Sequence, residues 1–190
     1  IDNKIIILGN KGLVKCLDLD DKKMLWEHSV LPDGESKNSF FGGGVAHNSH
    51  DTVYVATSFG EVISIQISNG KIKWRYKVEA PILDGPVVVN DTIFFTDVTN
   101  VSRSLSSTNN LNWLVEGINY NQIRTKSGRP TPADHLMVVP KSNGSIEVVD
   151  LMTGELQWNY DYNYSKNGFT QNVFGAFNGD PVVDEDQIYF

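Results

Sequence analysis

The sequence predicts an all-β protein in which four-stranded antiparallel sheets form the blades of a β-propeller. Short alternating apolar segments recur along the chain between turn residues, and no segment shows a sustained helical pattern. Each repeat also carries a tryptophan in its last strand. Trp26, Trp74, Trp113 and Trp158 are separated by 48, 39 and 45 residues. These intervals match a propeller blade, which takes about 40 to 50 residues.

Residues 52–78 show the repeat most clearly. "TVYVAT", "VISIQI" and "IKWRYKV" alternate and are rich in β-formers, and the turns "SFGE" and "SNGK" separate them. This pattern predicts strands joined by tight turns. Gly70 supplies the positive φ that the second turn requires, and Trp74 follows at a fixed distance.

Three other segments repeat this order: "KIIILGNKGLVKCLDLDDKKMLWEHSV", "TIFFTDVTNVSRSLSSTNNLNWLVEG" and "LMVVPKSNGSIEVVDLMTGELQWNYDY". A further apolar strand begins three of the units, at "GGGVA", "DGPVVV" and "GDPVVD". We therefore expect residues 1–190 to form a single partial propeller of three complete and two partial blades. The expected blades are approximately 1–30 (partial), 40–78, 83–116, 128–161 and 175–190 (partial).

The tryptophans are expected to be structural. Each one falls on the outer strand of its blade, where it can cover the apolar gap to the neighbouring blade. Gly70 and Gly154 turn the chain just before two of them, and we expect Trp74 and Trp158 to be largely buried. Stacking of a ligand on the four rings is the alternative, but a residue that recurs once per blade more simply serves the blade.

Charge and composition exclude several classes of function. The chain has 16 Lys and Arg against 23 Asp and Glu, a net charge of −7, with no basic cluster, so we expect no nucleic-acid partner. Its apolar runs are far shorter than the roughly 20 residues of a transmembrane helix. Cys16, the only cysteine, excludes an intrachain disulfide and is expected to be buried and unreactive.

No residue pattern predicts catalysis. His47, His50 and Asp51 stand in the segment "HNSHD", but a turn between strands does not give two histidines the shared helical face that would aim them at one metal. Phosphate-binding and nucleophile-elbow motifs are absent from the sequence. We therefore predict a protein that is not an enzyme, with no catalytic residues, cofactor or metal.

The segment "VVDLMTGELQW" (148–158) resembles the repeat of quinoprotein-like propellers, Ala-x-Asp-x-x-Thr-Gly-x-x-x-Trp. The Asp position falls on Asp18, Gln66, Leu105 and Asp150 in the successive units. Within this superfamily, residues 40–75, 80–97 and 137–158 resemble the BamB family of the outer-membrane β-barrel assembly machinery. The resemblance covers nearly the whole chain. It implies a propeller of eight blades, of which this chain holds roughly half.

The resemblance also implies a function. BamB-like proteins are scaffold lipoproteins at the periplasmic face of the bacterial outer membrane, and they bind the POTRA domains of a BamA-like protein through inter-blade loops. No lipid anchor is recognised in this chain. The matching loops are 121–129 and 173–180, in which Ile123 and Arg124 correspond to the family's apolar and basic contacts. The family's acidic contacts are not matched, because Ala176 and Asn178 stand there.

Propeller geometry independently places the long connections 31–39, 117–128 and 161–174 on one face. They carry apolar side chains, Ile123 and Phe174 among them, that suit protein recognition or pack back on their own blades. We therefore expect a partner-binding site that includes Ile123, Arg124, Phe174 and Asn178. Two other functions stay open: a quinone (PQQ)-dependent dehydrogenase and the sensor propeller of a signalling protein.

Overall fold

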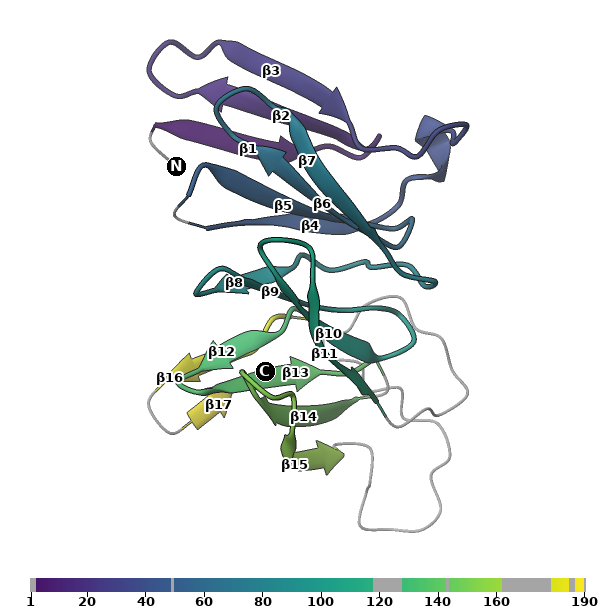
Figure 1. The fold of residues 1–190 in the computed structure, drawn as a ribbon, viewed down its shortest axis with the longest axis vertical. Helices are drawn as coiled ribbons and strands as arrows, with labels where there is room; N and C mark the ends of the chain where they lie inside the picture. Colours follow the sequence, from purple (N-terminus) through teal and green to yellow (C-terminus); the bar gives the residue numbers. More distant parts are fainter. Residues whose placement is uncertain are drawn as a thin grey trace.

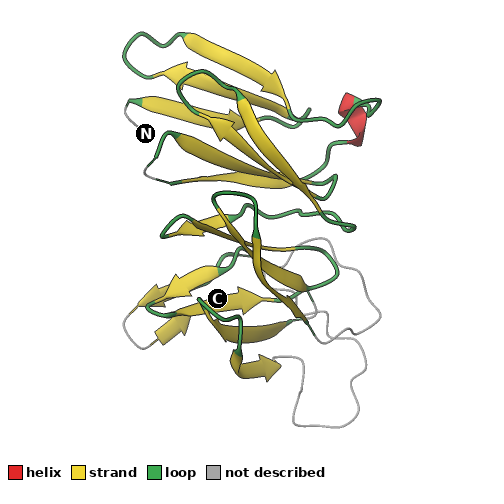
Figure 2. Cartoon of the chain, viewed as in Figure 1, coloured by secondary structure: helices red, strands yellow, loops and turns green. Residues whose placement is uncertain are grey.

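A computed structural model describes residues 3–48, 50–117, 128–142, 144–161, 179–184 and 187–189. It confirms the all-β propeller: the first four antiparallel sheets follow one another as separate blades along the long axis of the molecule, and the short last sheet lies beside the fourth (Figure 1). The helical structure in the described residues is one 3-10 turn, Lys37–Ser39, and it is not long enough to cross a membrane (Figure 2).

Each sheet is a blade whose strands pair in chain order. Blade 1 contains β1 (Lys4–Leu8), β2 (Leu13–Asp18) and β3 (Met24–Ser29). Blade 2 contains β4 (Gly43–His47), β5 (Thr52–Thr57), β6 (Glu61–Gln66) and β7 (Ile72–Lys77). Blade 3 contains β8 (Val87–Val89), β9 (Thr92–Thr96), β10 (Val101–Ser106) and β11 (Leu111–Glu116). Blade 4 contains β12 (Thr131–Ala133), β13 (Leu136–Pro140), β14 (Ser145–Asp150) and β15 (Leu156–Asp161), and blade 5 contains β16 (Val182–Asp184) and β17 (Gln187–Tyr189).

The hydrophobic core lies in layers between the blades. Because successive side chains of a strand point to opposite faces, β5 and β6 send Val55 and Ile63 into the layer beside blade 1. The same strands send Ala56 and Val62 into the layer beside blade 3. Both faces are covered, and the middle strands are therefore almost continuously apolar.

Three tryptophans join consecutive blades by the same hydrogen bond. The indole Nε1 of Trp26 donates to the carbonyl of Ile67 at 2.7 Å. Trp74 donates to the carbonyl of Ser107 at 3.0 Å, and Trp113 donates to that of Leu151 at 3.1 Å. Each acceptor lies in the turn between the third and fourth strands of the next blade. These three rings therefore span the gap between blades.

The glycines of these turns meet two demands at once. Gly70 and Gly154 have φ values of 72° and 74°, as a turn glycine should. A Cβ added to Gly70 would lie 2.7 Å from the ring of Trp26, and one added to Gly154 would lie 2.7 Å from the ring of Trp113. The glycine thus turns its own blade and receives the tryptophan of the preceding one. The sequence pattern shows only the first role.

Trp158 does not follow the other three, and the expectation that it is largely buried is wrong. Its exposed fraction is 44%, whereas Trp113 is 8% exposed. The described part of blade 5 consists of β16 and β17. Among the described residues, no third–fourth turn of a following blade covers the Trp158 ring as Leu151 and Gly154 cover that of Trp113.

A second correction concerns the Asp position of the repeat in blade 3. In blade 4, the amide of Asp150 donates to the carbonyl of Glu155, and in blade 3 the amide of Ser106 donates to that of Asn110. Ser106, and not Leu105, therefore occupies this position. The third–fourth turn of blade 3 is one residue shorter than that of blade 4. Counting back from the tryptophan in the sequence therefore selected the wrong residue by one position.

The carboxylate at this position holds the turn together. Asp150 Oδ1 accepts hydrogen bonds from the amides of Met152 and Thr153 at 2.9 and 2.8 Å. The Thr153 hydroxyl donates to the same atom at 3.1 Å. These bonds, the one from the Thr153 amide first among them, lower the pKa of Asp150 from its ordinary value.

Candidate functional site

The four residues proposed for partner binding, Ile123, Arg124, Phe174 and Asn178, lie outside the described residues. The structure does describe both ends of the connection from blade 3 to blade 4, at Gly117 and Gly128. It also describes the end of the next connection, at Gly179. The described part of the candidate site therefore consists of the ends of these two connections.

The two connections end side by side. The amide of Arg129 donates to Asp180 Oδ1 at 2.8 Å, and its guanidinium Nε donates to Asp180 Oδ2 at 2.8 Å. Just behind this pair, the Thr131 hydroxyl donates to the carbonyl of Pro181 at 3.0 Å. Both charged side chains are nearly half exposed, so this ion pair contributes little stability. Its effect is geometric, since it fixes the end of one connection against the end of the next.

The backbones approach each other closely at the same place. Gly128 has a φ of 87°, and a Cβ there would lie 2.6 Å from the carbonyl oxygen of Gly179. A larger residue would force the two chain segments apart. Sequence reasoning placed these connections on one face but did not identify this glycine contact.

The start of the connection between blades 3 and 4 is held by the second–third turn of blade 3. The amide of Gly117 donates to the carbonyl of Asn100 at 3.2 Å. The ammonium of Lys141, on blade 4, donates to the same carbonyl at 3.0 Å and to the hydroxyl of Ser102 at 2.8 Å. The connection thus leaves blade 3 at a point that blade 4 also contacts.

Four buried or nearly buried charges lie around this point. Lys141 is 2.8 Å from the carboxylate of Glu147, and their side chains are 1% and 7% exposed. Arg103 is 2.6 Å from Asp97, with side chains 12% and 1% exposed. Burial lowers the pKa of Lys141, and the charge of Glu147 opposes that shift. Sequence reasoning missed this cluster, although Glu147, a charged residue within the otherwise apolar strand segment "SIEVVD", was a visible signal.

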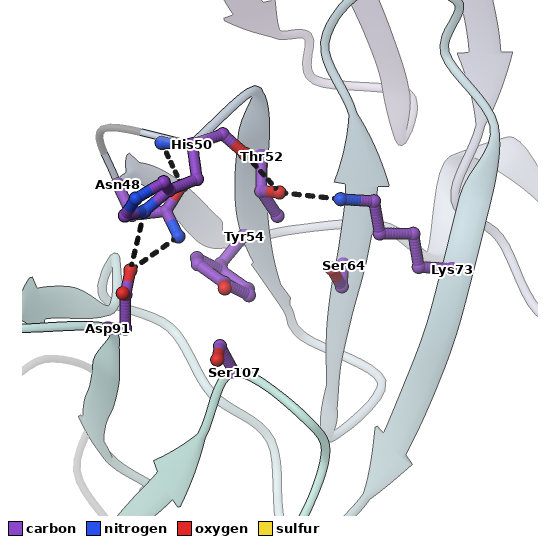
Figure 3. A pocket seen from close by; sticks show the side chains of 8 residues that line it. All are labelled: Asn48, His50, Thr52, Tyr54, Ser64, Lys73, Asp91 and Ser107. Atoms are coloured by element: carbon purple, nitrogen blue, oxygen red, sulfur yellow. Dashed lines mark hydrogen bonds and ion pairs between the residues drawn. The ribbon is translucent and has the colours of Figure 1, made fainter.

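A polar cavity of about 280 Å³ lies elsewhere, between blades 2 and 3 beside the first–second turns (Figure 3). Its polar groups are largely paired with one another. Asp91 Oδ1 accepts a hydrogen bond from the side-chain nitrogen Nδ2 of Asn48 at 2.8 Å and lies 3.2 Å from His50 Nδ1, while Lys73 donates to the Thr52 hydroxyl at 2.7 Å. The two contacts of Asp91 fasten the first–second turns of blades 2 and 3 together.

The histidines singled out in the sequence have ordinary partners in this region. His47 Nδ1 lies 2.9 Å from the carbonyl of Asn48, and His50 pairs with Asp91 as above. Among the described residues, no three His, Cys, Asp or Glu side chains are arranged to hold a metal ion. Cys16 is fully buried, and burial raises the pKa of its thiol.

Successive antiparallel sheets, joined at three junctions by a tryptophan that reaches the turn of the next blade, define the chain as part of a β-propeller. Residues 10–190 match the family described as "Outer membrane protein assembly factor BamB", and the chain belongs to this family.

Individual relatives agree with this assignment. The chain is 26% identical over 163 residues to the BamB of Moranella endobia, which covers 83% of this chain and 42% of that protein. It is 33% identical over 90 residues to the BamB of Escherichia coli, covering 46% of this chain and 23% of that protein. The chain thus spans about two fifths, or less, of these relatives' length.

Solved structures share the fold. The crystal structure of BamB from Moraxella catarrhalis superposes with a TM-score of 0.81 at 15% identity, over 100% of this chain and 55% of that chain. A europium-containing methanol dehydrogenase superposes with a TM-score of 0.67 at 15% identity, over 85% of this chain and 40% of that chain. Both are similar in architecture, and at this identity the likeness concerns the fold alone.

Proposed function

We propose that the chain is part of a non-enzymatic scaffold lipoprotein at the periplasmic face of the outer membrane, in the β-barrel assembly machinery. Its partner is the POTRA region of a BamA-like protein. Membership of the BamB family supports the general role. The observation that carries the docking surface is the Arg129–Asp180 contact, because it sets the ends of two consecutive connections side by side.

The proposed contact residues are Ile123, Arg124, Phe174 and Asn178, on the connections that end at Gly128 and Gly179. Apolar anchors beside an arginine suit an interface, since arginine combines stacking with paired hydrogen bonds to carboxylates. Arg124 is the most informative position, because reversal of its charge changes recognition while leaving the described strands unaltered.

The test is a titration of the full-length protein with the purified POTRA domains of its own BamA-like partner. We expect Arg124→Glu to weaken binding by about tenfold or more, in the range of an interface hot spot. Lys73→Glu is the matched control, because it makes the same reversal of charge away from the proposed surface, beside the polar cavity between blades 2 and 3. Equal affinity of Arg124→Glu and wild type would exclude this surface as the docking site. Absence of wild-type binding would exclude the proposed role in the assembly machinery.

A quinone-dependent dehydrogenase is the second candidate, because the fold is shared with a methanol dehydrogenase. The same protein preparation tests it. We expect no quinone absorbance band after incubation with pyrroloquinoline quinone and a divalent or lanthanide cation, and no alcohol-dependent dye reduction. A bound quinone together with turnover would replace the scaffold proposal.

A further inference from the structure

The turn between the second and third strands breaks the repeat in one blade. Gly12, Gly60 and Gly144 occupy one position of this turn with φ values of 66°, 70° and 82°. In blade 3 the same position is Asn100, with a φ of 66° and an exposed fraction of 3%. A left-handed backbone favours glycine, so the asparagine is the departure that needs a reason.

Part of what Asn100 does belongs to the repeat. The first residue after the fourth strand donates its amide to the carbonyl at this turn position. Val30 donates to Gly12 and Val78 to Gly60, both at 2.8 Å, and Gly117 donates to Asn100 at 3.2 Å. Glycine suffices for this contact in blades 1 and 2, so the asparagine side chain serves another purpose.

That side chain connects blade 3 to blade 4. Asn100 Oδ1 accepts hydrogen bonds from the amide and the hydroxyl of Ser142 at 2.9 and 3.0 Å. Lys141 donates to the Asn100 carbonyl itself. Lys141 and Ser142 of blade 4 thus hold the turn of blade 3 at Asn100. This is the turn that Gly117 contacts where the chain leaves blade 3.

The needs of folding alone do not account for the buried charges beside this contact, which include Glu147, the partner of Lys141, and Arg103. Strand pairing places Ile63 of blade 2 at the position that Glu147 occupies in blade 4 and Arg103 in blade 3. Blade 2 therefore packs at this position with an apolar side chain. Buried ion pairs are often no more stabilising than apolar pairs of similar volume. A repeat that is broken without a gain in packing marks a functional position.

We propose that Asn100 and Lys141 are positioning residues for partner docking: they fix the point at which the connection leaves blade 3, and so fix how that connection is presented. This inference rests on the proposed function. The Arg129–Asp180 contact fixes the other end of the same connection. Contacts between blades therefore hold both described ends of the connection, at Gly117 and Arg129, and binding groups that are positioned before association cost less to order, which raises affinity.

The experiment uses the full-length protein and the POTRA titration. The first variant, Asn100→Gly, restores the repeat residue and keeps the turn, while removing the contacts to Ser142. The second, Lys141→Met with Glu147→Leu, replaces the buried pair without leaving a lone charge. We expect both to keep a melting temperature within a few degrees of wild type and to weaken POTRA binding by about tenfold.

A matched control separates positioning from general stability. Arg75 lies 2.8 Å from Glu61 and donates to the carbonyl of Val30, at the start of a different connection. Arg75→Met with Glu61→Leu removes that pair, and we expect unchanged POTRA affinity. Hydrogen exchange at the Gly117 amide should accelerate in both test variants and stay unchanged in the control.

The outcomes are distinct. If wild type binds and the test variants bind equally well, the positioning role is wrong and the proposed function stands. If the control loses as much affinity as the test variants, the effect is general and the positioning role is also wrong. If wild type does not bind, the proposed function fails, and the inference that rests on it fails as well.

Discussion

Trp113 and Gly154 form one contact, although they lie in different blades. The indole nitrogen reaches the carbonyl of Leu151, and the glycine leaves room for the ring. At this scale the sequence predicted which residues matter but not what they contact. The recurrence of tryptophan and glycine is visible in the chain, whereas the partner belongs to the next repeat.

Gly154→Ala should destabilise the protein. The added methyl group meets the Trp113 ring, and the φ of 74° is unfavourable for alanine. We expect a loss of about 2–4 kcal/mol in the free energy of unfolding, measured by urea denaturation. Gly34→Ala is the control, because Gly34 has a φ of 84° with nothing within 4 Å of the added Cβ. Equal losses in the two variants would show that the tryptophan contact contributes nothing.

Asp150→Asn should have an effect that depends on pH. Hydrogen bonds from Thr153 and Met152 lower the pKa of Asp150 below 3.8, so the folded state favours the carboxylate. The stabilisation is present above that ordinary value and is lost as the pH falls through the lowered pKa. Wild type should therefore exceed the variant in urea midpoint at pH 7, and the difference should shrink as the pH falls through the lowered pKa of Asp150. A difference that is independent of pH would contradict this cause.

At the scale of the strand and turn, regular features were predictable and irregular ones were not. The alternation in residues 52–78 gave strands that the structure confirms as β5, β6 and β7. The Asp position of the repeat was assigned one residue too early in blade 3, because the pattern of apolar residues does not reveal the length of the turn before Trp113. Trp158 was expected to be buried, because its own blade is well formed in sequence, but burial depends on a neighbour.

Asn109→Gly should stabilise the shortened turn of blade 3. Asn109 takes the glycine position with a φ of 71°, and its side-chain oxygen is buried without a hydrogen-bond partner in the described residues. Removing that oxygen and relaxing the backbone should gain about 1 kcal/mol in thermal or urea unfolding. Asn109→Ala removes the same oxygen but keeps a Cβ, so it should gain less. A loss of stability in the glycine variant would count against the unpaired oxygen as a source of strain.

For the whole molecule, protection should follow the layered core. Strands β5 and β6 are buried on both faces, whereas β1 and β16 alternate with half-buried or exposed side chains. Repeat proteins open unit by unit, because each unit contacts only its neighbours. In native-state hydrogen exchange we expect the slowest amides in β5 and β6, and the fastest in β1 and β16. Uniform protection along the chain would indicate a single cooperative unit instead.

The docking surface is the part that sequence reasoning reached least well. Family resemblance together with propeller geometry selected Ile123, Arg124, Phe174 and Asn178, which lie outside the described residues, so these positions stay a prediction. The supporting groups were missed, because Lys141, Asn100 and Asp180 become neighbours of their partners only through contacts between blades. The propeller of about eight blades also stays a prediction.

At three junctions the tryptophan hydrogen bond points forward along the chain, from one blade to the turn of the next. A blade therefore has two unlike sides, one that donates the tryptophan and one that receives it, and these three junctions use the same contact. Such head-to-tail joints let a unit be copied and inserted during evolution without inventing a new interface. The number of blades is then free to change by duplication, limited by whether the ring can still close.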